Sequence, residues 1–127
     1  MLLGAVTLND NMQWAERFHS ADVAQGNLRT LGGTQVLYAV PLTGGTNITL
    51  IATSDQGWAG LTTTVVEAIL AMATTPGATF TLTIGAVVQS VAFRHHEPPA
   101  VKFTPILSRV VPDAGDYYTG EIKLVTV

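Results

Sequence analysis

Residues 61–74, LTTTVVEAILAMAT, form the one segment of the chain in which apolar residues recur with a helical period. Spacings of three and four residues place side chains on the same face of an α-helix. The apolar face predicted here is broad enough to lie on a β-sheet. It comprises Leu61, Val65, Val66, Ile69, Leu70, Met72 and Ala73.

Signals for both ends of this helix are present. Thr64 and Glu67 have the T-x-x-E spacing of a capping box, in which the hydroxyl and the carboxylate satisfy each other's free backbone amides. Pro76 and Gly77 predict the end, because Pro cannot continue a helix and Gly tolerates a left-handed turn. Glu67 is the only charged residue of the segment. We therefore expect a helix covered on more than one side, either as a core helix or in part by a neighbouring subunit.

Composition favours one domain that associates with itself. The chain has 127 residues, the size of one domain, and no cysteine, which excludes disulfides and thiolate metal sites. Charged residues make up 12% of the chain, where an ordinary soluble domain has roughly 25%. A surface this poor in charge does little to oppose association. We therefore expect an oligomer.

Charge and hydropathy exclude two classes of partner. A formal net charge of −3 argues against a face that binds the nucleic-acid backbone. The chain has no run of 18 apolar residues, so no membrane span is expected. The first ten residues, MLLGAVTLND, lack the basic region of a signal peptide, and none is expected.

The rest of the chain has the pattern of strands separated by turns. Two hairpins are predicted, one from 35–41 and 48–53, the other from 78–84 and 87–94. Residues 12–24 are ambiguous, although the i, i+4 spacing of Trp14 and Phe18 suits a helical turn. Gly32-Gly33 and Gly44-Gly45 predict turns rather than phosphate loops. Further strands are expected at 2–8, 100–104 and 116–127. The predicted fold class is α+β, mainly β: a β-sandwich or barrel-like domain with one helix packed on it.

The order and spacing of these elements resemble those of a known family. The similarity lies in residues 48–53, 61–74, 76–84, 87–99 and 116–127, including the sequences FRHHEPPA and DYYTGEIKLVTV. In this respect the chain resembles the N-terminal, ring-forming domain of distal tail and tail-tip (baseplate) proteins of long-tailed bacteriophages. That domain is related in fold to tail-tube proteins.

The resemblance implies a structural virion protein with no enzymatic activity and no cofactor. It implies a single tail-tube-type domain over 1–127, with an N-terminal strand and arm at 1–34 and the hairpins, helix and C-terminal strand at 35–127. It also implies a six-fold ring of this chain that connects the tail tube to tip or hub proteins. DNA would pass through the lumen without sequence-specific contact. The implied location is the virion tail, assembled in the host cytoplasm.

The residue types that could form a chemical site have simpler interpretations. His95, His96 and Glu97, with His19, Asp113 and Asp116 elsewhere, offer metal-ligand types, but adjacent strand residues point to opposite faces and a zinc site needs three or four ligands. Ser90, His95 and Asp116 are residue types of a hydrolase triad, but no G-x-S-x-G motif accompanies them. Asp113 and Asp116 as a carboxylate pair lie in a turn-like loop. We therefore predict no catalytic, cofactor or metal site.

Aromatic and charged residues are predicted instead to lie at subunit contacts. The first 30 residues combine such residues with weak periodicity, and we expect them to reach an adjacent subunit or ring. The alternative function is a small carbohydrate- or ligand-binding β-sandwich with an aromatic platform that includes Trp58. The residues predicted at subunit interfaces are Trp14, Phe18, Arg94, His95, His96, Glu97, Tyr117 and Tyr118.

Overall fold

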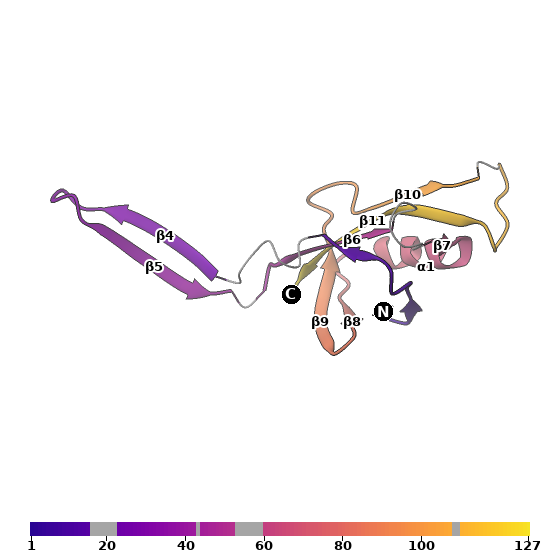
Figure 1. The fold of residues 1–127 in the computed structure, drawn as a ribbon, viewed down its shortest axis with the longest axis horizontal. Coiled ribbons are helices and arrows are strands. Elements are labelled where there is room, and N and C mark those ends of the chain that lie inside the picture. Colours follow the sequence, from indigo (N-terminus) through magenta and orange to yellow (C-terminus); the bar gives the residue numbers. More distant parts are fainter. Residues whose placement is uncertain (16–22, 43, 53–59, 108–109) are drawn as a thin grey trace.

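The structure, a computed structural model, describes residues 1–15, 23–42, 44–52, 60–107 and 110–127. Their strands form a nine-stranded antiparallel sheet and a separate two-stranded sheet, and one helix packs on the larger sheet (Figure 1). The mainly β, α+β class expected from the sequence is confirmed. The strands are β1 (Leu2–Leu3), β2 (Val6–Thr7), β3 (Gln13–Trp14), β4 (Val23–Arg29), β5 (Gln35–Pro41), β6 (Asn47–Ala52), β7 (Leu61–Thr62), β8 (Phe80–Ile84), β9 (Val87–Phe93), β10 (Val101–Pro105) and β11 (Tyr117–Thr126).

The C-terminal strand β11 is the centre of the large sheet. On one side it pairs with β6 and β7, and on the other with β9 and β10. The sheet continues from β9 through β8 to β1 and β2, and from β6 to β3. Ile122 and Leu124 of β11 are fully buried, as the alternation in 116–127 predicts. A strand with partners along both edges and apolar side chains in the core holds the fold together.

The helix α1 (Thr63–Ala73) covers one end of this sheet. Its buried stripe is Thr63, Val66, Ile69 and Ala73, which joins the core formed by the sheet. The helix and its end before Pro76 are confirmed. Leu70, assigned to the buried face from the sequence, is instead exposed, because the stripe that meets the sheet is narrower than predicted.

The predicted start of the helix is wrong by two residues. Thr62, not Thr64, is the N-cap, and its hydroxyl accepts a hydrogen bond from the Val65 backbone amide. Leu61 precedes the helix in β7, which pairs with β11. This pairing holds Thr62 in extended geometry and so fixes where the helix begins. Glu67 therefore lies beyond the first turn, outside a capping box.

Several strand predictions are confirmed. The hairpin of β8 and β9 forms with Gly85 at its turn, and Leu82 of β8 and Val91 of β9 are buried. The predicted edge strand at 100–104 is β10, which pairs with β11. The strand predicted at 48–53 is β6, with Ile48, Leu50 and Ala52 buried.

Two pairing predictions are wrong. Residues 2–8 do not form one strand: the chain turns at Gly4 and Ala5, and β1 pairs with β2. The hairpin predicted from 35–41 and 48–53 does not form, because β5 pairs with β4 while β6 pairs with β11 and β3. A strand whose paired residues lie 68 to 78 positions further along the chain thus takes the place of the neighbouring strand. Alternation alone does not identify a strand's partner.

The hairpin of β4 and β5 projects from the rest of the molecule (Figure 1). We call it the arm, and call the nine-stranded sheet with α1 the body. The arm crosses the boundary at residue 34 that the sequence suggested, since β4 precedes it and β5 follows it. In the described part of the chain, no helix is long and apolar enough to cross a membrane.

Candidate assembly surface

The arm is a regular seven-pair hairpin. Its register runs from Val23 opposite Pro41 to Arg29 opposite Gln35. The turn is closed by the Thr30 amide, which donates to the Thr34 carbonyl at 2.8 Å, and Gly33 has a φ of 86°, a conformation that favours glycine. The turn predicted at Gly32-Gly33 is confirmed.

The two faces of the arm differ in chemistry. Directly opposed residues lie on the same face, and faces alternate along each strand. One face consists of the pairs Ala24–Val40, Gly26–Tyr38 and Leu28–Val36 and holds no charged, amide or carboxylate side chain. We call it the arm face. The other face is mixed and contains Gln25, Asn27, Arg29, Gln35, Val23, Leu37, Ala39 and Pro41.

The arm face is open to solvent in the single chain. Tyr38 is 59% exposed and Val40 is 60% exposed, and Leu28 is exposed to a similar degree. A two-stranded hairpin is at best marginally stable alone in water. A contiguous exposed apolar surface marks a site of interaction with another molecule. The arm therefore has the character of a contact element that another surface completes.

A second exposed apolar surface lies at the opposite end of the molecule, where β10 leads into β11 (Figure 1). We call it the tip patch: Ile106, Leu107, Val110, Val111 and Tyr117, all exposed.

The base of the tip patch is fixed to the body. The Ile106 amide donates to the Tyr117 carbonyl at 3.1 Å. The Thr63 hydroxyl at the start of α1 donates to the Asp113 carbonyl at 2.7 Å, and the Thr63 amide donates to the Asp116 carbonyl at 3.1 Å. These hydrogen bonds hold the base of the tip patch against the buried start of α1.

The predicted interface residues fall in different environments. Tyr117 lies in the tip patch, Tyr118 packs partly buried against the core, and Trp14 is half-buried in β3. Phe18 lies outside the described residues, as do His19 and Trp58 of the other sequence hypotheses. His95, His96 and Glu97 are exposed in the loop after β9.

Arg94 is an internal residue, only 3% exposed. Its guanidinium donates to the Thr49 hydroxyl of β6, and to Glu97 Oε2 at 2.9 Å. The ion pair with Glu97 thus forms within the chain. The contacts attach the loop after β9 to β6 and leave little of Arg94 for a neighbouring subunit.

Residues considered for catalysis or metal binding lie at opposite ends of α1. Asp113 and Asp116 contact its first residue, Thr63, whereas His95 lines a hollow with Ala73 and Thr74 at its end. An eleven-residue helix is roughly 16 Å long. Neither the Ser90–His95–Asp116 trio nor a metal site that joins His95 to Asp113 or Asp116 is therefore assembled. Among the described residues no group of three or more histidine or carboxylate side chains is placed to hold a metal ion.

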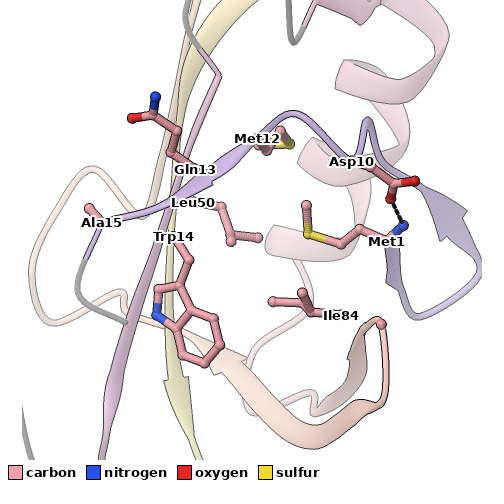
Figure 2. Close-up of a pocket in the computed structure, with 9 residues that line it drawn as sticks. Met1, Asp10, Met12, Gln13, Trp14, Ala15, Leu50 and Ile84 are labelled. Carbon is pink, nitrogen blue, oxygen red and sulfur yellow. Dashed lines mark hydrogen bonds and ion pairs between the residues drawn. The ribbon is translucent and has the colours of Figure 1, made fainter. Parts of the chain in front are cut away.

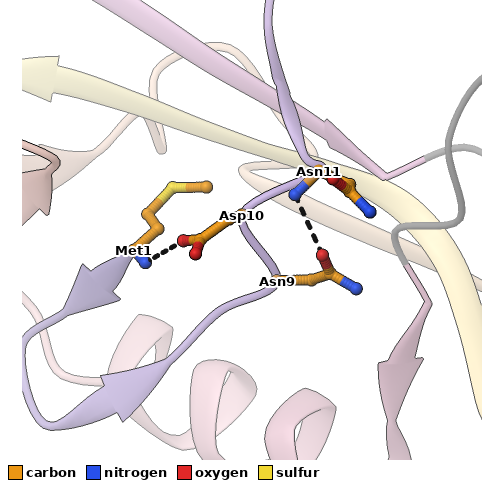
Figure 3. A network of polar contacts seen from close by, with 4 residues as sticks. All are labelled: Met1, Asn9, Asp10 and Asn11. Carbon is orange, nitrogen blue, oxygen red and sulfur yellow. Dashed lines mark hydrogen bonds and ion pairs between the residues drawn. The ribbon is translucent and has the colours of Figure 1, made fainter.

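A pocket that the sequence did not indicate opens beside β3. It has a volume of about 630 Å³, with Trp14 and Leu50 on one side and Met1 and Ile84 on the other (Figure 2). The backbone amine of Met1 forms an ion pair with Asp10 at its rim, beside a turn in which the Asn11 amide donates to Asn9 Oδ1 at 2.9 Å (Figure 3). The pocket is lined by Met1 and by residues of β3, β6 and β8, which are remote from one another in sequence.

Comparisons of the chain with protein-family models, with curated proteins and with solved structures found no match.

Proposed function

We propose that this chain is a structural subunit that assembles with copies of itself into a ring in a bacteriophage tail. The ring would connect the tail tube to tip or baseplate proteins and surround the DNA channel. The observation that carries the proposal is the arm, whose apolar face is exposed in the single chain. The low fraction of charged residues and the mainly β fold support it further.

The arrangement of contacts follows from ring closure. In a cyclic ring each subunit presents one surface to the copy on one side and a different surface to the copy on the other. A chain with an apolar arm at one end and an apolar patch at the other meets this requirement. We expect six subunits, as the resemblance to distal tail proteins implies.

The test is the native mass of the purified protein over a concentration series, by light scattering and native mass spectrometry, with electron microscopy of the assembled fraction. The expected result is a native mass of about six subunits, with rings visible by electron microscopy. Tubes would assign the chain to the tail tube rather than to a connector. A monomer at every concentration would overturn the proposal.

The pocket beside β3 favours a second candidate, a binding module for a small carbohydrate or apolar ligand. A pocket of about 630 Å³ with an aromatic side chain in its wall lies within the size range of ligand sites. The chain has two tryptophans, so Trp58→Phe leaves Trp14 as the single indole reporter. Saturable change in its fluorescence with a glycan, abolished by the pocket-filling variant Ile84→Phe, is the expected result for a binding module. No response across a glycan panel would reject that function.

A further inference from the structure

We infer that the arm face of one copy packs on the tip patch of the next copy, so that subunits join head to tail. This inference rests on the proposed self-assembly and names the two surfaces that perform it. Both surfaces are apolar and exposed, and they lie at opposite ends of the molecule (Figure 1). Opposite placement prevents one chain from satisfying its own patch with its own arm.

The surface area of the chain agrees with two contact surfaces per subunit. The accessible surface is 7875 Å². A compact monomer of 13.4 kDa exposes roughly 6,500 Å², so this chain exposes about 1,400 Å² more. A standard interface buries roughly 800 Å² on each partner. The excess is therefore similar in size to the roughly 1,600 Å² that two standard contacts would bury on one subunit.

Charge favours the arm-to-tip pairing over pairing of two arms. Arg29 is the only charged residue between Val23 and Leu42, so the arm is cationic. Residues 105–117 contain Asp113 and Asp116 against a single cation, Arg109. Arg29 lies on the face opposite the arm face, so it would flank such a contact rather than lie in it, and two stacked arms would bring two segments of like charge together without an anion. Exposed charges add little affinity, but they select partner and orientation.

The key experiment mixes two variants, each lacking one surface. The arm variant is Tyr38→Thr with Val40→Thr, which removes apolar side chains from the arm face and keeps strand propensity. The tip variant is Ile106→Ser with Val110→Ser. We expect each variant alone to need on the order of 100-fold more protein to assemble than the unmodified chain. We expect their mixture to form a one-to-one dimer, because one intact arm and one intact tip remain.

Matched controls separate the contact from general effects. Val23→Thr with Leu37→Thr makes the same kind of change on the opposite face of the same strands. Val88→Thr removes an exposed apolar side chain of β9, far from both surfaces. Both controls should assemble like the unmodified chain. Circular dichroism should show that all variants keep the folded body, since every changed side chain is exposed.

Cysteine pairs give an independent readout, because the chain has no cysteine of its own. Tyr38→Cys in one copy and Val110→Cys in another should form an intermolecular disulfide under mild oxidation. Tyr38→Cys alone should not.

The outcomes separate this inference from the proposed function. An unmodified chain that assembles, with a tip variant that assembles equally well or with efficient Tyr38→Cys self-coupling, would overturn the arm-to-tip contact and leave self-assembly standing. An unmodified chain that stays monomeric, with no disulfide in the mixed pair, would overturn both.

Discussion

The body and the arm contain the same types of apolar residue, but the body buries them and the arm leaves them exposed. Leu50 in β6 is completely buried, whereas Leu37 in β5 is 56% exposed. Both strands are rich in apolar residues, and both are assigned as strands from sequence. The body buries its apolar face against other parts of the same chain. The arm has only its own two strands, so its apolar face remains for another molecule.

This comparison leads to a general expectation about stability. Changes in the body should lower the free energy of unfolding of the isolated chain, and changes in the arm should not. These effects are expected at concentrations where the protein is monomeric, because assembly would add stability through the arm.

The largest contrast is expected between Leu50→Ala and Leu37→Ala. Deletion of a fully buried leucine leaves a cavity and typically costs about 2–5 kcal/mol of unfolding free energy. The exposed Leu37 should cost less than about 0.5 kcal/mol. Urea denaturation followed by circular dichroism measures both. Equal effects would show that the arm packs on its own body in solution.

Next in size is the effect of Gly120→Ala, where β11 passes β10. A Cβ at Gly120 would lie 2.0 Å from the Lys102 carbonyl oxygen, so the two strands must separate. Forced overpacking costs typically about 1–3 kcal/mol. Gly115→Ala is the matched control, since nothing lies within 4 Å of its added carbon. A midpoint of thermal unfolding unchanged by Gly120→Ala would contradict the β10–β11 register.

Two hairpin turns allow a direct comparison of body and arm. Gly85, between β8 and β9, and Gly33, in the arm, both have positive φ. Alanine in this conformation costs about 1–2 kcal/mol. We expect Gly85→Ala to lower the unfolding free energy of the body by that amount. Gly33→Ala should leave it unchanged and instead speed amide exchange in β4 and β5. Slow exchange in the arm of the Gly33→Ala monomer would argue against its independence.

The smallest expected effect tests the start of the helix within the body. Thr62→Ala removes the N-cap hydroxyl and should cost about 1 kcal/mol. Thr64→Ala, the position that a capping-box pattern suggests, should be close to neutral or slightly stabilising, because alanine is the better helix former. Denaturant midpoints of the two variants decide between the positions. The reverse ranking would place the cap at Thr64.

Local patterns in the sequence predicted individual elements well. The apolar period in residues 61–74 located α1, and the alternation around Gly85 located β8, β9 and their turn. Strand β4 escaped detection because its sequence, VAQGNLR, alternates weakly and contains glycine. The signal that was available is its position directly before the turn that leads into β5. The tip patch and the pocket beside β3 had no local signal, since each depends on which segments meet.

The sequence by itself determined the mainly β class, the helix, the turns and the absence of cysteine. These depend on side-chain spacing and on backbone preferences within a few residues. The tertiary structure decided that β6 pairs with β11, that Thr62 caps the helix and that Arg94 lies inside. It also decided that Leu37 is exposed while Leu50 is buried. The physical reason is that the burial of a side chain depends on which strands pair and pack together. Those strands lie far apart along the chain, so local sequence does not identify them.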